Sequence, residues 1–173
     1  MSGKRIVITG AASGIGAAAV AQHLADGDQV VALDVKPITA KVQQALRCDM
    51  ADPASISAAL AAIDGPVDAL LNIAGLPGTV APELIMRVNT LGLRAITQGL
   101  IDRLRRGGAI VNVASIAGFN WARHLKDINE LLATPSYEAG VEWCAAHPMD
   151  GNTAYHFSKE CVVVYTMQMA GPA

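Results

Sequence analysis

Tyr155 and Lys159 are the side chains whose types and spacing point most directly to chemistry. They are four positions apart in a stretch, residues 153–170, that is expected to be helical, so both lie on one helix face. A free phenol loses its proton only at a pH of about 10, and an adjacent ammonium group favours the ionised form. Such a pair can move a proton to or from a hydroxyl or carbonyl oxygen. The same spacing also arises by chance between surface residues of a helix.

Two further residues could serve the same reaction. Ser115 ends a predicted strand, residues 109–115, and its hydroxyl could form a hydrogen bond with a substrate oxygen. Asn89 lies in a helix expected over residues 82–105, and its backbone could anchor a water molecule that leads protons away from Lys159. All four residues occur in the order expected if they share one site, which argues against a chance pairing of Tyr155 with Lys159.

A glycine-rich turn at residues 9–16, T-G-A-A-S-G-I-G, could bind a pyrophosphate. It lies between residues 4–8, an apolar run typical of a buried parallel strand, and residues 17–25, which favour a helix. Backbone N–H groups and the positive end of the helix dipole stabilise a phosphate there, and glycine permits the tight turn and close approach. An ordinary loop is the alternative. The predicted ligand contacts are Thr9, Gly10, Ser13, Gly14, Ile15 and Gly16.

Two other strand ends could contact the same dinucleotide. Asp34 ends a predicted strand, residues 29–34, where a carboxylate accepts hydrogen bonds from the adenosine ribose. It would also repel a 2′-phosphate, which favours NAD over NADP, although Lys36 close by weakens this inference; a helix cap or loop acid is the alternative. A fourth strand, residues 67–75, runs into a small-residue turn where a ligand can lie against the backbone. The predicted contacts there are Asn72, Ala74 and Gly75.

The composition bounds the kind of protein. The 173 residues suit one domain with a sizeable core, and 52% are apolar but only 4% aromatic, which is typical of an α/β layered interior. The net charge of −2 includes no long like-charged block, so we expect no nucleic-acid or membrane partner. Three scattered cysteines match neither a metal site nor a disulfide framework. With a strand beginning by Lys4, there is no room for a signal peptide, and we expect a cytoplasmic location.

Strands and helices alternate along the chain, which predicts right-handed crossovers and a parallel sheet. Beyond the segments already named, we expect a weak helix at residues 38–45, a short third strand at 46–50 and another helix at 53–63. We expect Gly107 and Gly108 to end the long helix. Residues 116–151 change in character and hold both tryptophans. With helical patches at 125–133 and 138–146, they are expected to form an inserted cover over the carboxyl ends of the strands.

Taken together, these motifs resemble the short-chain dehydrogenase/reductase family from Lys4 to the chain end. The resemblance rests on the turn at residues 9–16, on Asp34, on residues 72–75 (N-I-A-G where the family has N-N-A-G) and on the tetrad Asn89, Ser115, Tyr155 and Lys159. It implies an α/β fold of the Rossmann type, a doubly wound parallel sheet in three layers. It also implies that Asp49 and Met50 lie near the adenine.

The resemblance implies an NAD-dependent oxidoreductase, with NADP less expected, that acts on a small-molecule alcohol or carbonyl compound without a metal. Tyr155 would be the general acid/base, Lys159 would bind the nicotinamide ribose and favour the tyrosinate, and Ser115 would orient the substrate oxygen. Ser115 and Tyr155 are unusually far apart for the family. This insertion is similar to that of bacterial coniferyl-alcohol and 3α-hydroxysteroid dehydrogenases, and the Trp121-Ala122-Arg123 stretch favours the former and hence a bulky aryl or alicyclic alcohol.

Family members continue with another strand, a Pro-Gly turn, a mobile helix and a last strand, none of which is found here. We therefore expect one catalytic domain over residues 1–173 that is a fragment of a longer protein, a homo-oligomer at full length. The alternative to an enzyme is a catalytically inactive dinucleotide-binding or regulatory fragment.

Overall fold

The computed structural model describes residues 3–170, and the chain divides into two compact units. Unit 1 comprises Met1–Ala74 and Leu93–Val111, and unit 2 comprises Gly75–Gly92 and Asn112–Ala173. That these form one domain with an inserted cover stays a prediction. No helix among residues 3–170 combines the length and apolar character needed to cross a membrane.

Unit 1 is built on a five-stranded sheet with the order β3-β2-β1-β4-β5. Its strands are β1 (Arg5–Thr9), β2 (Gln29–Asp34), β3 (Gln44–Arg47), β4 (Val67–Asn72) and β5 (Leu104–Asn112). The central strand β1 pairs in parallel with both β2 and β4, so Ile6 lies between Val30 and Ala69. Parallel neighbours joined through helices confirm the predicted α/β fold of the Rossmann type.

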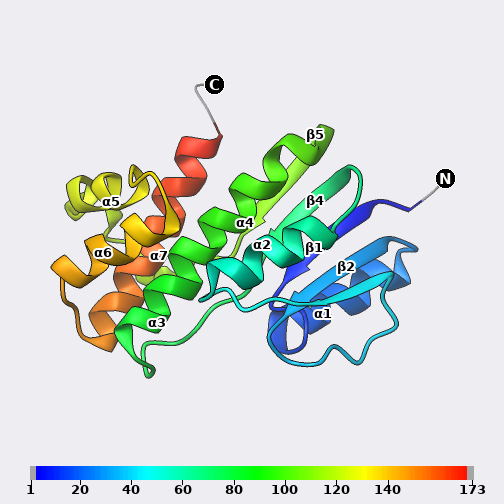
Figure 1. Cartoon of the computed structure of the whole chain (residues 1–173), viewed down its shortest axis with the longest axis horizontal. Helices are drawn as coiled ribbons and strands as arrows, with labels where there is room; N and C mark the ends of the chain where they lie inside the picture. Colours follow the sequence, from blue (N-terminus) through cyan, green and yellow to red (C-terminus); the bar gives the residue numbers. More distant parts are fainter. Residues whose placement is uncertain (1–2, 171–173) are drawn as a thin grey trace. The chain divides into compact units, whose positions relative to one another are not determined.

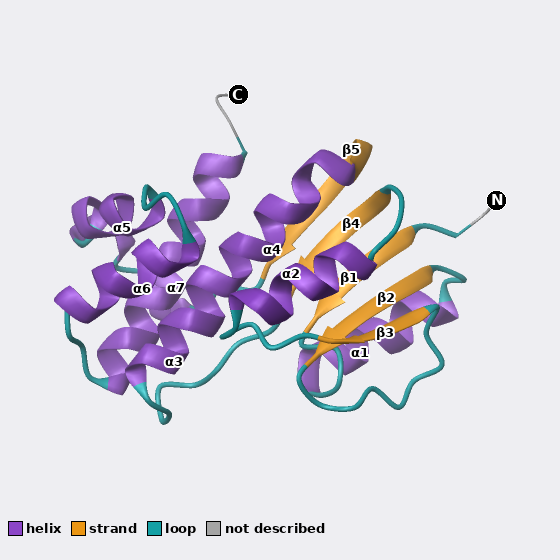
Figure 2. Ribbon diagram, in the orientation of Figure 1, coloured by secondary structure: helices purple, strands orange, loops and turns teal. Residues whose placement is uncertain are grey.

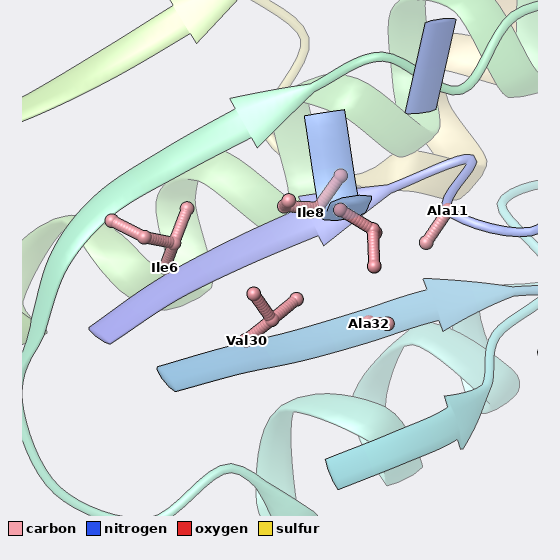
Figure 3. Packing of buried hydrophobic residues seen from close by; sticks show 6 residues of the cluster. Ile6, Ile8, Ala11, Val30 and Ala32 are labelled. Carbon is pink, nitrogen blue, oxygen red and sulfur yellow. The ribbon is translucent and has the colours of Figure 1, made fainter. Parts of the chain in front are cut away.

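Helices cover both faces of this sheet. Figure 1 shows α1 (Gly14–Ala25) on one face and α2 (Pro53–Ala62) with α4 (Leu93–Leu100) on the other. Because side chains alternate along a strand, Ile6, Ile8 and Val30 share one face with Ala32 and pack with Val20 of α1 (Figure 3). These apolar contacts hold the end of β1 and the start of α1 together, where the predicted phosphate turn lies.

Two sequence predictions in unit 1 are wrong. Residues 38–43 are not helical, and the third strand is Gln44–Arg47, earlier than expected. Residues 44–47 pair with β2, beginning with Gln44 opposite Val31. This pairing outweighs the weak helix propensity of residues 38–45.

The fifth strand also differs from its prediction at both ends. It begins at Leu104, after a 3₁₀ turn η2 (Ile101–Arg103), so Gly107 and Gly108 lie within the strand and do not end the helix. Gly107 has a φ of +82°, which glycine adopts without strain, so these glycines bend a strand where the sequence suggested a helix cap. The strand ends at Asn112, and Ser115 follows it in a loop.

The described residues of unit 2 form helices joined by loops, apart from Asn112 at the end of β5 (Figure 2). It contains α3 (Pro82–Met86), a π-helical segment η1 (Arg87–Gly92), the 3₁₀ turns η3 (Ile116–Gly118) and η4 (Trp121–Arg123), α5 (Leu125–Leu132), α6 (Tyr137–Ala146) and α7 (Gly151–Met169). The three helices predicted after residue 120 are thus confirmed to within two residues at each end. The long helix predicted over residues 82–105 is interrupted by η1, and its last α-helical part, α4, ends at Leu100.

Candidate functional site

The glycines of the phosphate turn are required by close contacts at two positions and by a positive φ angle at the third. Gly10 has a φ of +70°, and a Cβ atom there would lie 2.8 Å from the Cα of Ala74. A Cβ atom on Gly16 would lie only 1.9 Å from the carbonyl oxygen of Gly10, so the first turn of α1 packs directly on the turn backbone. Gly14, with a φ of +54°, has open space where its Cβ would be. The turn is thus closed on the sheet side and open beside Gly14.

The N-terminus of α1 has the features of an anion site. Ser13 is its N-cap residue, but the side chain makes no capping hydrogen bond. The first N–H groups of a helix have no partner within the helix, and here no side chain replaces one. Ser13, Gly14 and Ile15 are exposed, Ile15 by 66%. These N–H groups and the helix dipole are available to a phosphate.

Backbone hydrogen bonds fix the carboxylate of Asp34. Its Oδ2 accepts from the N–H of Ala12 at 2.9 Å, within the phosphate turn, and its Oδ1 accepts from the N–H of Lys36 at 2.8 Å. A carboxylate has about four acceptor sites, so two such bonds leave capacity for ribose hydroxyl groups. Asp34 is therefore held in a defined orientation next to the turn, as the ribose role requires.

Thr9 and Asn72 lie inside unit 1, each only 1% exposed. The Thr9 hydroxyl oxygen accepts from the N–H groups of Ile73 and Ala74 at 3.0 and 3.1 Å. The Asn72 amide nitrogen donates to the hydroxyl of Thr97 in α4 at 2.9 Å. Their side chains therefore hold the β4 turn against the phosphate turn and against α4.

The two residues expected near the adenine differ in accessibility. Asp49 is half-buried, and its Oδ1 accepts from the N–H of Ala51 at 2.9 Å. Met50 is buried, and its sulfur lies 4.0 Å from the thiol of Cys48. Burial raises the pKa of the Cys48 thiol to about 11, so this thiol is neutral and unreactive at neutral pH.

In unit 2, α7 carries both members of the proton-transfer pair. Asp150 caps this helix by accepting from the N–H of Thr153 at 2.7 Å, and this bond lowers the pKa of the Asp150 carboxyl. Tyr155 is half-buried and Lys159 is 7% exposed. The Lys159 ammonium donates to the backbone oxygen of Val113 at 2.8 Å, and burial lowers its pKa.

Asn89 connects the loop before α3 to α7. It is 1% exposed and lies in the π-helical segment η1, a type of distortion frequently found at functional sites. Its Oδ1 accepts from the N–H of Leu76 at 2.7 Å, and its Nδ2 donates to the Leu76 carbonyl at 3.0 Å. The same Nδ2 donates to the hydroxyl of Ser158 at 3.1 Å, and that hydroxyl donates to the Tyr155 carbonyl at 2.7 Å. Both Nδ2 hydrogens and one acceptor site of Oδ1 are thus used in holding this part of unit 2 together.

Ser158 is the residue of this network that the sequence did not single out. It is completely buried and lies one position before Lys159. The only signal in the sequence was its place inside the Tyr155–Lys159 segment, because a serine in a helix is usually a surface residue.

Ser115 lies in unit 2 together with α7. Its hydroxyl oxygen accepts from the N–H of Ala117 at 3.2 Å and so caps η3. At the other end of η3, Gly118 packs so closely on α7 that its Cβ would lie 2.8 Å from the Lys159 carbonyl. The structure therefore brings η3 and its cap Ser115 against the helix that carries Lys159.

The predicted site residues thus fall into two groups. Unit 1 holds the phosphate turn, the two aspartates with Met50, and the β4 end as far as Ala74, whereas the tetrad and the exposed Gly75 belong to unit 2. Among residues 3–170, no three His, Cys, Asp or Glu side chains are grouped so that they could hold a metal ion.

Comparisons with known proteins show which proteins the chain is similar to. A family model described as short chain dehydrogenase matches residues 4–126. Coniferyl-alcohol dehydrogenase from Pseudomonas sp. (strain HR199 / DSM 7063) is 32% identical over 98% of this chain and 67% of its own length. D-xylose 1-dehydrogenase from Caulobacter vibrioides is 32% identical over 82% of this chain and 63% of its own.

A similar solved structure is that of 3-alpha-hydroxysteroid dehydrogenase from Pseudomonas sp. B-0831, complexed with NADH. It matches with a TM-score of 0.78 and 28% identity, over 95% of this chain and 65% of the other. The chain therefore spans about two thirds of the length of these relatives.

Proposed function

Because the chain belongs to the short-chain dehydrogenase family, we propose that it carries the catalytic residues of an NAD-dependent alcohol dehydrogenase. The observation that carries this proposal is the set of fixed polar groups on α7. Lys159 is buried and hydrogen-bonded one helical turn after Tyr155, and Ser158 between them is held by Asn89. A buried lysine and a buried asparagine are rare in a purely structural helix, because both must be desolvated.

The residues of unit 1 fit a dinucleotide. The open space at Gly14 and the uncapped first turn of α1 suit a pyrophosphate, and the held carboxylate of Asp34 suits unmodified ribose hydroxyls. A 2′-phosphate would be repelled by Asp34, so we propose NAD as the preferred cofactor. When bound, the nicotinamide ring supplies the hydride acceptor or donor.

The residues of unit 2 would supply proton transfer. In the oxidation direction, the Tyr155 oxygen takes the hydroxyl proton of the alcohol, and Lys159, one helical turn further along α7, would bind the nicotinamide ribose. The Ser115 hydroxyl orients the substrate oxygen, and the backbone of Asn89 anchors the water that carries the proton onward. Through Ser158, Asn89 also fixes the backbone of Tyr155, which keeps the phenol in place.

A bulky, apolar alcohol is the substrate class that we propose, with a coniferyl-type aryl alcohol ahead of a 3α-hydroxysteroid. Each of these two alcohols appears in the name of a protein that is similar to this chain. Directly after Ser115, Ile116 and Phe119 are 89% and 78% exposed, so apolar side chains are presented next to a proposed catalytic hydroxyl. Such surface favours a ligand with apolar rings.

The proposal is tested by following NADH absorbance with coniferyl alcohol, a 3α-hydroxysteroid and ethanol. We expect turnover with the bulky alcohols, no turnover by Tyr155→Phe, and unchanged NAD affinity in that variant, because it loses only the phenol oxygen. Equal turnover by wild type and Tyr155→Phe would contradict the assignment of the acid/base, and preference for ethanol would contradict the substrate class.

A further inference from the structure

A buried carboxylate, Glu160, follows Lys159 on α7 and has no part in the proposed proton transfer. It is 2% exposed, and its Oε2 lies 2.7 Å from the Nδ1 of His124. His124 lies between η4 and α5, and its side chain is half exposed. A buried carboxylate is strongly unfavourable unless it is hydrogen-bonded, so the contact with His124 offsets part of the cost of burying Glu160.

An aromatic stack joins the same two parts of unit 2. Trp143 of α6 lies nearly parallel to Phe157 of α7, with ring centroids 5.8 Å apart and an interplanar angle of 8°. Trp143 also stacks on His147, with ring centroids 3.9 Å apart. Phe157 also meets the ring of His124 edge-on at 6.4 Å. Trp143 is therefore occupied by protein rings.

These contacts are made on the side of α7 that faces away from Tyr155. At about 100° per residue, Phe157 lies roughly 200° and Glu160 roughly 140° around the helix from Tyr155. Lys159 lies only about 40° from Tyr155. In Figure 1, α5 and α6 lie beside α7 within unit 2, as these contacts require. Residues 119–150, here called the inserted segment, thus pack on the back of the helix.

We propose that Glu160 is a positioning residue, which fixes Tyr155 and Lys159 by hydrogen-bonding α7 to His124 of the inserted segment. The front of α7 is held by Asn89 through Ser158, and the back is held by Glu160. Both anchors act within one turn of the reactive pair, so losing either lets the helix shift or fray there. This role rests on the proposed function, because it concerns the helix that would carry the acid/base.

Conservative and disruptive variants of both partners test the proposal. Glu160→Ala and His124→Ala remove the hydrogen bond, whereas Glu160→Gln keeps an acceptor and His124→Asn keeps a donor near the place of Nδ1. Lys126→Ala is the matched control, because it removes only an exposed ion pair with Glu130 on the same inserted segment. Amide hydrogen exchange of α7 is measured by mass spectrometry, with β1 as internal reference, and turnover is measured with NAD and coniferyl alcohol.

We expect both alanine variants to exchange α7 amides faster, on the order of tenfold, with β1 unchanged. Glu160→Gln, His124→Asn and Lys126→Ala should exchange α7 like the wild type. The alanine variants should also lose kcat at an unchanged KM for NAD, because the proposed cofactor contacts of unit 1 are intact.

Unchanged α7 exchange in both alanine variants would overturn the proposal, as would equal acceleration in β1 and α7, which indicates a general loss of stability. If Glu160→Ala fails to fold, His124→Ala decides, because it changes the half-exposed partner. A wild type without turnover would contradict the proposed function and leave the exchange result to decide the positioning role.

Discussion

Replacing Gly16 by alanine should open the phosphate turn and weaken NAD binding while leaving the rest of unit 1 folded. The new Cβ would lie 1.9 Å from the Gly10 carbonyl oxygen and 2.6 Å from its carbon, both backbone atoms that cannot rotate away. Ordinary contact begins at 3.4 Å, so α1 and the turn must separate by about 1.5 Å. A hydrogen bond from an N–H group to a phosphate does not survive a displacement of that size.

The size of the effect follows from the bonds that are lost. A hydrogen bond to a charged group contributes about 1.5–3 kcal/mol, so losing even one raises the Kd for NAD at least about tenfold. Gly27 is the matched control, because it has a positive φ angle and open space at the Cβ position but lies outside the turn. Alanine at Gly27 should lower the free energy of unfolding by about 1–2 kcal/mol through backbone strain alone.

The assay is calorimetric titration of each variant with NAD, together with urea unfolding. We expect Gly27→Ala, at the far end of α1, to bind NAD like the wild type despite its lower stability. Gly16→Ala should have a much higher Kd for NAD than Gly27→Ala, even where the two variants have lost the same free energy of unfolding. If Gly16→Ala binds NAD as tightly as Gly27→Ala, the turn does not bind the pyrophosphate.

Three further outcomes follow from other contacts. Asn89→Ala should lower the free energy of unfolding by about 2–4 kcal/mol in urea titrations, because three hydrogen bonds to Leu76 and Ser158 are lost; a change below 1 kcal/mol (about one net hydrogen bond) would refute this network. Burial lowers the pKa of Lys159 in the folded chain below 10.5, its ordinary value in the unfolded chain. At a pH between the folded and the unfolded pKa, the unfolded chain therefore binds more protons than the folded chain. Stability of the wild type relative to Lys159→Met should therefore rise as pH increases toward 10.5, and a constant difference would contradict the burial of this ammonium. In thiol labelling, half-buried Cys144 should react before buried Cys48, and the reverse order would show that the interior of unit 1 opens readily.

Local patterns predicted the strand, the glycine turn and the helix at the start of the chain well, because all three are short-range features. The positions of Gly10, Gly16 and Asp34 in the structure follow directly from the order of these elements. The segments that failed were those decided by pairing with distant residues. Residues 38–45 have weak helix propensity, but their last part pairs with β2; likewise Gly107 looked like a helix end and is a bend in β5.

The contacts that hold the proposed tetrad could not be read from the sequence. Tyr155 and Lys159 are visible as a pair on one helix, but the link from Asn89 to Ser158 joins residues 69 positions apart. The bond from His124 to Glu160 likewise depends on how the helices of unit 2 pack. Sequence patterns show which face of a helix is apolar, and they do not show which buried polar groups meet.

The most direct test of the proposed function is to follow the hydride itself. Coniferyl alcohol with deuterium in place of both hydrogens at the carbinol carbon is incubated with NAD and the chain, and the NADH formed is analysed by mass spectrometry. The proposed function predicts NADH that carries one deuterium from each alcohol oxidised, and none from Tyr155→Phe. Absence of NADH with the wild type, or NADH without the label, would contradict it.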